Sequence, residues 1–196
     1  MNKSELRKIY LAKRKALPRA RRDISSRQIA QTFFDKSDLS KVRFLHCFLP
    51  IEKLAEVDTT FIFRRIWEDF RDVKTVVPRV DQATAEIENL TYSATDELLR
   101  SAWQIDEPIH HEKISPEEID LVLVPLLCFD RGGHRVGYGK GFYDRFLALC
   151  RSDCLKIGLS FFPPEEEIED ANSADVRLNF CVTPDHVYAM QGSNSH

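Results

Sequence analysis

Apolar residues recur along the chain with two alternating periods, one typical of helices and one typical of buried strands. Leu6, Ile9 and Tyr10 follow a helical spacing and predict a helix over residues 2–17, which Pro18 ends. Further helices are expected over residues 26–34, 59–70, 97–100 and 142–150. Strands are expected over residues 42–49, 73–77, 87–92, 121–129, 155–161 and 180–183.

The apolar run over residues 121–129 indicates the type of sheet. Nearly continuous apolar strands are buried on both faces and belong to parallel sheets. Strands that alternate with helices therefore predict an α/β fold, with a mainly parallel central sheet and helices on both faces. A chain of 196 residues fits one domain over residues 1–190. We expect a helical segment over residues 2–36 to pack on this domain and residues 191–196 to form a disordered tail.

Several classes of protein are disfavoured by composition. The longest apolar run, residues 121–129, contains Pro125 and is far shorter than the ~20 residues of a membrane-spanning helix. No apolar signal segment stands at the N-terminus. The five cysteines are odd in number and form no CxxC motif, and the six histidines form no HExxH motif. These features predict a cytoplasmic protein that has no disulfides, no zinc site and no membrane partner.

Charge is unevenly distributed along the chain. Residues 1–27 carry ten Lys and Arg against Glu5 and Asp23, so this segment is +8 while the whole chain is −3. A basic segment on an acidic body suggests an anionic partner, although charge alone favours a solvated helix face. A nucleic-acid-binding module is the competing interpretation. The acidic remainder, and the lack of aromatic residues interleaved with basic ones, speak against it.

Three alternating glycines follow the strand over residues 121–129. They are Gly137, Gly139 and Gly141, with Lys140 among them and a helix after them. Glycines let successive backbone N–H groups point at one anion, and the N-terminus of the next helix adds positive potential. In open α/β sheets, ligands bind at the carboxyl ends of the strands. The segment therefore predicts phosphate binding, and a plain flexible strand-to-helix turn is the alternative.

This loop matches neither of two common nucleotide motifs. A Walker A loop would need Gly in place of His134 and Ser or Thr in place of Gly141. The dinucleotide motif would need Gly in place of Phe142. Asp144 falls in the first turn of the following helix, where it either stabilises the helix dipole or holds Mg²⁺.

The segment from Phe129 to Asp144 resembles the hallmark of the 5-formyltetrahydrofolate cyclo-ligase family. The family pattern is Phe-Asp, then Arg-Leu-Gly-x-Gly-x-Gly-[Phe/Tyr]-Tyr-Asp. The chain has Phe129-Asp130, then Arg135-Val-Gly137-Tyr-Gly139-Lys-Gly141-Phe-Tyr143-Asp144. Weaker matches in the family's order are Lys3-x-x-x-Arg7, Glu56-Val-Asp-Thr59 and Glu107-Pro108.

The resemblance implies a fold and a reaction. The fold would be a three-layer α/β domain like those of the NagB/RpiA/CoA-transferase group. The reaction would convert 5-formyltetrahydrofolate to 5,10-methenyltetrahydrofolate, with ATP as co-substrate, Mg²⁺ as cofactor, and ADP and phosphate as products. Both substrates are small molecules, so no nucleic-acid partner is implied, and we expect a monomer.

The resemblance also implies site residues. Lys140 and Arg135 would be catalytic. ATP would contact Lys3, Arg7, Arg135, Val136, Gly137, Tyr138, Gly139, Lys140, Gly141, Phe142 and Tyr143. Folate would contact Ile51, Asp58, Tyr138, Gly139, Lys140, Gly141 and Phe142. Asp144 would hold Mg²⁺. The family's second metal contact is an Asp, and Asn179 stands at the matching position, where it offers a carbonyl oxygen but no charge.

Two other functions remain open at the level of sequence. Related folds carry phosphosugar isomerases and acyl-transfer enzymes, and a fold does not determine a function. The second alternative is a relative that binds folate or nucleotide but has lost catalysis, because Asn179 replaces an expected Asp. An isomerase or acyl-transfer enzyme would ignore ATP, whereas the inactive relative would bind its ligand and release no ADP.

Overall fold

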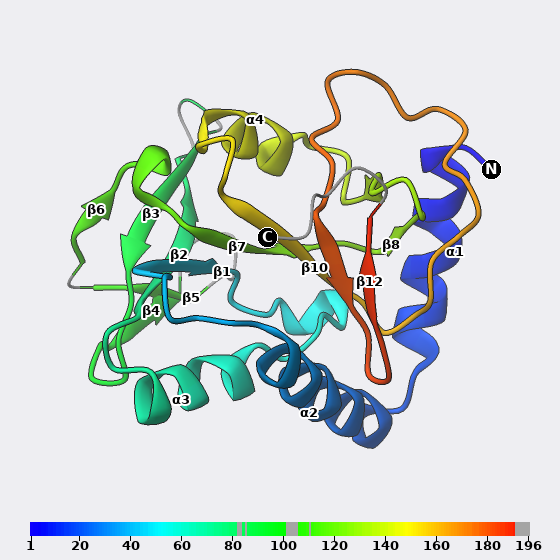
Figure 1. Cartoon of the computed structure of the whole chain (residues 1–196). Helices are drawn as coiled ribbons and strands as arrows, with labels where there is room; N and C mark the ends of the chain where they lie inside the picture. The colour runs from blue at the N-terminus through cyan, green and yellow to red at the C-terminus, as the bar shows by residue number, and fades with distance from the viewer. Residues whose placement is uncertain (82–83, 85, 101–105, 110, 191–196) are drawn as a thin grey trace.

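The computed structural model describes residues 1–190 except 82–83, 85, 101–105 and 110 (Figure 1). The tail expected to be disordered, residues 191–196, lies outside the described residues. The main strands are β1 Phe44–Cys47, β2 Lys74–Val80, β3 Ile87–Thr91, β6 Lys113–Ile114, β7 Leu121–Pro125, β10 Leu155–Leu159, β11 Phe180–Val182 and β12 Val187–Ala189. They form one sheet in the order β12-β11-β10-β7-β1-β2-β3-β6.

The centre of the sheet is parallel. Strands β11, β10, β7, β1 and β2 are neighbours and all pair in parallel. The edge strands β12 and β6, and β3 next to β6, are antiparallel to their neighbours. The mainly parallel sheet expected from the sequence is therefore confirmed.

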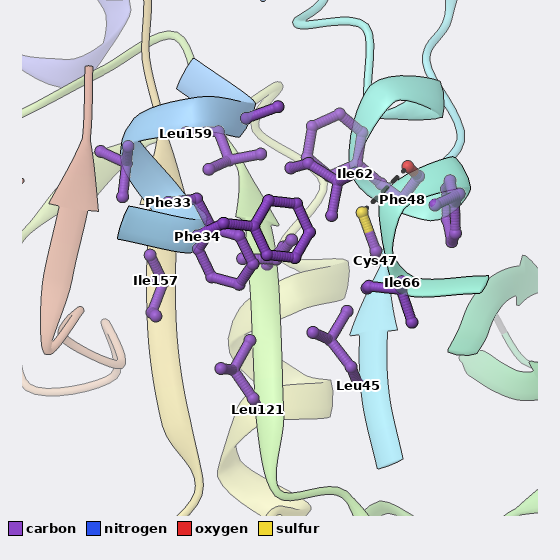
Figure 2. Close-up of a cluster of buried hydrophobic side chains, with 14 of the residues drawn as sticks. Phe33, Phe34, Leu45, Cys47, Phe48, Ile62, Ile66, Leu121, Ile157 and Leu159 are labelled. Carbon is purple, nitrogen blue, oxygen red and sulfur yellow. Dashed lines mark hydrogen bonds between the residues drawn. The ribbon is translucent and has the colours of Figure 1, made fainter. Parts of the chain in front are cut away.

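Helices cover both faces of this sheet. Helices α2 Arg19–Lys36 and α3 Thr60–Asp69 lie on one face, and α4 Phe142–Leu149 lies on the other (Figure 1). Figure 2 shows side chains of α2 and α3 meeting those of β1, β7 and β10; the labelled residues are Phe33, Phe34, Leu45, Cys47, Phe48, Ile62, Ile66, Leu121, Ile157 and Leu159. Val122 and Val124 of β7 face the core under α4. Burial on both faces explains the apolar sequence of this strand.

Helix α1 Lys3–Ala16 packs apart from the other helices, against a hairpin of β8 Cys128–Phe129 and β9 Arg135–Val136 (Figure 1). Leu6 and Tyr10 bury their side chains there with Leu127 and Val136. The helix begins with a capping box, in which the Asn2 side chain accepts from the Glu5 N–H and the Glu5 side chain accepts from the Asn2 N–H. The basic N-terminal helix is thus fixed beside the hairpin that leads into residues 137–141, which we call the glycine loop.

Three expectations about the elements are wrong. Residues 97–100 were expected to be helical, but β4 Leu98–Arg100 pairs with β5 Asp106–Pro108, because four residues are too few for a period to decide. The apolar run over residues 121–129 is two strands, since β7 ends at Pro125 and the Leu127 N–H pairs with Val136 instead. Helix α2 begins directly after Pro18 rather than at residue 26.

Short 3-10 helices cover Glu52–Leu54 and Pro116–Glu118. No helix in the described part of the chain is long and apolar enough to cross a membrane.

Candidate active site

The glycine loop connects β9 to α4, and the space beside Gly137 is not filled by protein atoms. Gly139 and Gly141 have φ angles of +85° and +67°, which side-chain-bearing residues rarely adopt. A Cβ atom on Gly139 would lie 3.1 Å from the Arg7 guanidinium carbon. A Cβ atom on Gly137 would meet nothing within 4 Å. The Arg7 side chain and the positive φ angle therefore favour glycine at position 139, whereas Gly137 leaves space that a ligand can approach.

Helix α1 brings one of its two predicted phosphate contacts, Arg7, to this loop. The Arg7 Nε donates to the carbonyl oxygen of Gly137 at 2.9 Å. The Lys3 ammonium forms an ion pair of 2.5 Å with Asp175, and both side chains are mostly buried. Arg7 thus meets the predicted loop, although it lies 130 residues from Gly137 in the chain, whereas Lys3 meets Asp175.

Arg135 and Asp144 are joined to one another. The Arg135 Nη2 donates to Asp144 Oδ1 at 2.7 Å, and Arg135 also donates to the carbonyl oxygen of Val176. The Val176 N–H in turn donates to Asp144 Oδ1 at 3.2 Å. Arg135 is buried, while about a third of Asp144 is exposed. Arg135, predicted to contact ATP, therefore ties the start of the loop to α4 and to Val176.

The structure gives Asn179 a role in strand pairing. Its Oδ1 accepts from the Lys156 N–H at 2.8 Å, and its own N–H donates to the Lys156 carbonyl oxygen. Asp175, which the sequence pattern did not indicate, pairs with Lys3 and directly precedes Val176, whose N–H donates to Asp144 Oδ1. Across the described residues, no group of three or more His, Cys, Asp or Glu could hold a metal. Mg²⁺ needs fewer protein ligands, since it is usually held by one or two carboxylates and substrate phosphates, and Asp144 is a partly exposed carboxylate beside the loop.

The predicted folate contacts divide into two groups. Asp58 Oδ1 accepts from the Thr60 N–H at 3.0 Å and from its hydroxyl at 2.6 Å, so this carboxylate is bound to the first residue of α3. Glu56, two residues earlier, accepts from the Tyr138 hydroxyl at 2.5 Å and from the Ile51 N–H at 2.7 Å. Ile51 and Tyr138 therefore meet through Glu56 and not through Asp58.

Glu56 is a buried carboxylate with a perturbed pKa. Its burial raises the pKa, against hydrogen bonds from Tyr138 and Ile51 and the charge of Arg14, which lower it; the net direction is upward. A buried carboxyl with a raised pKa next to a glycine loop marks a candidate functional residue. The sequence signal that indicates it is the acidic segment Glu56-Val-Asp-Thr59, in which Asp58 is the predicted folate contact.

The aromatic residues of the loop differ in environment. The Arg145 guanidinium lies over the Phe142 ring, 5.4 Å from its centroid. Tyr143 packs edge-on against Phe146 and His46 in the core under α4. Its hydroxyl is buried and meets no hydrogen-bonding partner in the described parts of the chain. Tyr143 is therefore a packing residue of this core, and Phe142 is partly exposed at the mouth of the loop.

Comparison with known proteins identifies the family to which the chain belongs. A model described as the 5-formyltetrahydrofolate cyclo-ligase family matches residues 1–184. The chain belongs to this family. The family resemblance predicted from the segment Phe129–Asp144 is thereby confirmed.

Relatives of this cyclo-ligase family member match it over different lengths. A 5-formyltetrahydrofolate cyclo-ligase of Mycoplasma genitalium is 44% identical over 52 residues, which are 26% of this chain and 32% of that protein. The mitochondrial 5-formyltetrahydrofolate cyclo-ligase of Arabidopsis thaliana is 27% identical over 95% of this chain and 79% of its own. The solved 5,10-methenyltetrahydrofolate synthetase of Aquifex aeolicus superposes with a TM-score of 0.78 at 29% identity, and the match covers 100% of this chain and 96% of that one.

Proposed function

We propose that this member of the family converts 5-formyltetrahydrofolate to 5,10-methenyltetrahydrofolate, using ATP and releasing ADP and phosphate. The observation that carries the proposal is the glycine loop, clasped by α1 through the Arg7–Gly137 hydrogen bond and open at Gly137. The proposal includes Mg²⁺ as cofactor, a cytoplasmic location, action as a monomer and no nucleic-acid partner.

The nucleotide half of the site would consist of the loop and α1. Backbone N–H groups of the loop and the N-terminus of α4 suit phosphate oxygens. Lys140, which is exposed, and Lys3 and Arg7 would add positive charge. Asp144 and Asp175 would hold Mg²⁺, which when bound neutralises charge on the phosphates. Arg135 would keep the loop and Asp144 in place through the bonds described above.

The chemistry follows from the nature of a formyl group. An N-formyl group is an amide and a poor electrophile, and its oxygen cannot leave as hydroxide. Transfer of the γ-phosphoryl group of ATP to that oxygen creates a phosphate leaving group. The second folate nitrogen then attacks the formyl carbon, phosphate departs and the ring closes. The protein would act mainly by positioning the two substrates and by stabilising charge at the γ-phosphate.

The folate half would lie at Glu56, Tyr138 and Ile51. A buried carboxylate with its oxygens already oriented by Tyr138 and Ile51 can accept further hydrogen bonds from N–H groups of a flat heterocycle. Phe142, partly exposed beside the loop, could pack against such a ring. Asp58 would act indirectly, by starting α3 directly after Glu56 and its neighbours.

Gly137→Ala provides the sharpest test of the nucleotide site. The added Cβ meets nothing within 4 Å in the protein, so the free energy of unfolding should change by less than ~0.5 kcal/mol. The KM for ATP should nevertheless rise roughly tenfold or more, because the methyl group would keep phosphates from the backbone. The assay follows the near-ultraviolet absorbance of the methenyl product with MgATP and 5-formyltetrahydrofolate.

Two controls accompany this assay. Omitting ATP from the wild-type reaction should abolish the product and the release of ADP. Product formed equally well without ATP, or no product from the folded wild-type protein, would reject the proposed reaction. An unchanged KM for ATP in Gly137→Ala would reject only the placement of the phosphates.

A further inference from the structure

Helix α1 carries an arginine that is buried instead of solvated. Arg14 is 3% exposed, and charged side chains are rarely buried unless they are paired. Its Nε donates to the Leu54 carbonyl oxygen at 2.9 Å, and its Nη1 donates to that of Leu126 at 3.0 Å. Its Nη2 donates to the Tyr138 hydroxyl. The guanidinium thus joins α1 to the segment before Glu56, to the end of β7 and to the glycine loop.

The hydrogen bonds continue from Arg14 to the acidic side of the site. The Tyr138 hydroxyl donates to Glu56 Oε1 at 2.5 Å, and Glu56 Oε2 accepts from the Ile51 N–H at 2.7 Å. Arginine has only donors, so the Tyr138 oxygen accepts from Arg14 and its single proton goes to Glu56. Glu56 must then serve as acceptor at both oxygens. Each hydrogen bond in this chain has only one possible direction.

We propose that Arg14 is a positioning residue for the folate half of the site, which sets the orientation of the Tyr138 hydroxyl and of the Glu56 carboxylate. This inference rests on the proposed function, because it assumes that folate binds at Glu56 and Tyr138. Lys3, Arg7 and Arg14 lie near one face of α1, since steps of four and seven residues return close to the same side of a helix. One helix therefore serves both halves: its first turns meet the nucleotide loop and its last turn orders the folate contacts.

Loss of Arg14 has a consequence for acid–base behaviour. The groups that face Glu56 are the Tyr138 hydroxyl, the Ile51 N–H and the charge of Arg14, and each lowers its pKa against the effect of burial. Without Arg14 the Tyr138 hydroxyl is free to rotate and the positive charge is gone. Both changes raise the pKa of Glu56 further, so the carboxylate becomes protonated at higher pH. A merely structural role for Arg14 would not confine the kinetic effect to the KM for 5-formyltetrahydrofolate.

The test compares Arg14→Met and Arg14→Lys with Lys15→Met, which removes an exposed charge from the same helix. We expect Arg14→Met to raise the KM for 5-formyltetrahydrofolate roughly tenfold or more, with the KM for ATP changed less than about twofold. The acid limb of kcat/KM for folate should move to higher pH. Arg14→Lys should restore part of the pH profile, since one ammonium keeps the charge but cannot make three forked bonds. Lys15→Met should match the wild type.

A second variant protects the test against misfolding of Arg14→Met. Tyr138→Phe keeps the ring and both carbonyl contacts of Arg14, and it removes only the bridging hydroxyl. It should show the same selective rise in the KM for folate, and the double variant should add little to either single change. Equal rises in both KM values, an unmoved pH profile, or additive effects would overturn the role of Arg14 while wild-type activity stands. A wild type without ATP-dependent product would instead reject the proposed function and this inference together.

Discussion

Lys140 differs from the other cations that surround the glycine loop. Lys3 pairs with Asp175, Arg7 bonds the Gly137 carbonyl oxygen, and Arg135 pairs with Asp144. Lys140 is exposed, and its ammonium has no ion pair or hydrogen bond within the described portion of the chain. The partnered cations give the loop its shape. Lys140 can move to incoming charge without breaking an existing contact.

Replacing Lys140 by alanine tests this division. We expect kcat to fall roughly a hundredfold, the size seen when one transition-state donor is removed, because the lysine would meet charge that develops on the γ-phosphoryl group. The free energy of unfolding should change by less than ~0.5 kcal/mol, since no contact is lost. Stopped-flow or steady-state assays of the methenyl product give kcat. Arg131→Ala, on the exposed β8–β9 turn, is the control. A near-normal kcat would remove Lys140 from the catalytic residues.

Individual residues also show what sequence could not decide. The acidic segment predicts carboxylates near the site, but only the turn of the chain after β1 decides that Glu56 faces Tyr138 and that Asp58 accepts from Thr60. Arg14 is one of ten Lys and Arg in residues 1–27, and no pattern separates it from the solvated ones. Its burial depends on carbonyl groups of Leu54 and Leu126, which are distant in sequence.

At the scale of elements, Asp120 joins three segments at the amino end of β7. Its Oδ2 accepts from the Arg43 and Phe44 N–H groups at 2.8 and 2.9 Å, and its Oδ1 accepts from Arg151 Nη2 at 2.9 Å. Burial raises the pKa of Asp120, but the bonds from Phe44, Arg151 and Arg43 outweigh it, so the pKa lies below the ordinary value of 3.8. The charged carboxylate therefore stabilises the start of β1 and the turn after α4.

Asp120→Ala should lower the free energy of unfolding near neutral pH by ~1–3 kcal/mol. Because the folded pKa is depressed, this stabilisation is fully present above the ordinary value of 3.8 and is lost as the pH falls through the lower folded pKa. The difference from wild type should therefore narrow in acid. Urea unfolding across the pH range measures it. Asp153→Ala, which removes an exposed partner of the same Arg151, is the matched control, and an equal loss in both variants would contradict the assignment.

Helices and strands were predicted correctly where apolar residues recur over a long segment or where a strand is buried on both faces. Helix α1, helix α3, helix α4 and the central strands were expected close to their observed bounds. The strands β5, β6, β9 and β12 were missed, because two or three residues carry no measurable period and form only when a partner strand is present. The same reason explains why β4 was expected to be a helix.

At the scale of the whole molecule, the site unites four distant segments. They are the helix α1, the residues 51–56 after β1, the glycine loop, and residues 175–176 before β11. The sequence could predict the loop from its glycines, and the family resemblance supplied Lys3 and Arg7. Nothing in the pattern indicates that the Val176 N–H donates to Asp144 or that Tyr138 donates to Glu56, since these contacts arise only from the folded sheet.

Such a divided site predicts that nucleotide stabilises the entire fold. A ligand at a hundred times its Kd adds ~2.7 kcal/mol to the free energy of unfolding. For a chain of 196 residues this should raise Tm by roughly 5–10 °C with MgATP. If Asp144 and Asp175 hold the metal, most of this shift should disappear when EDTA removes Mg²⁺, and Asp175→Asn should behave like the metal-free protein. Asp170→Asn is the control, since the Asp170 carboxylate accepts from the Lys3 N–H rather than from the Lys3 ammonium. A shift independent of Mg²⁺ would exclude the carboxylate pair as its site, and no shift at all would favour an isomerase or acyl-transfer enzyme that ignores ATP.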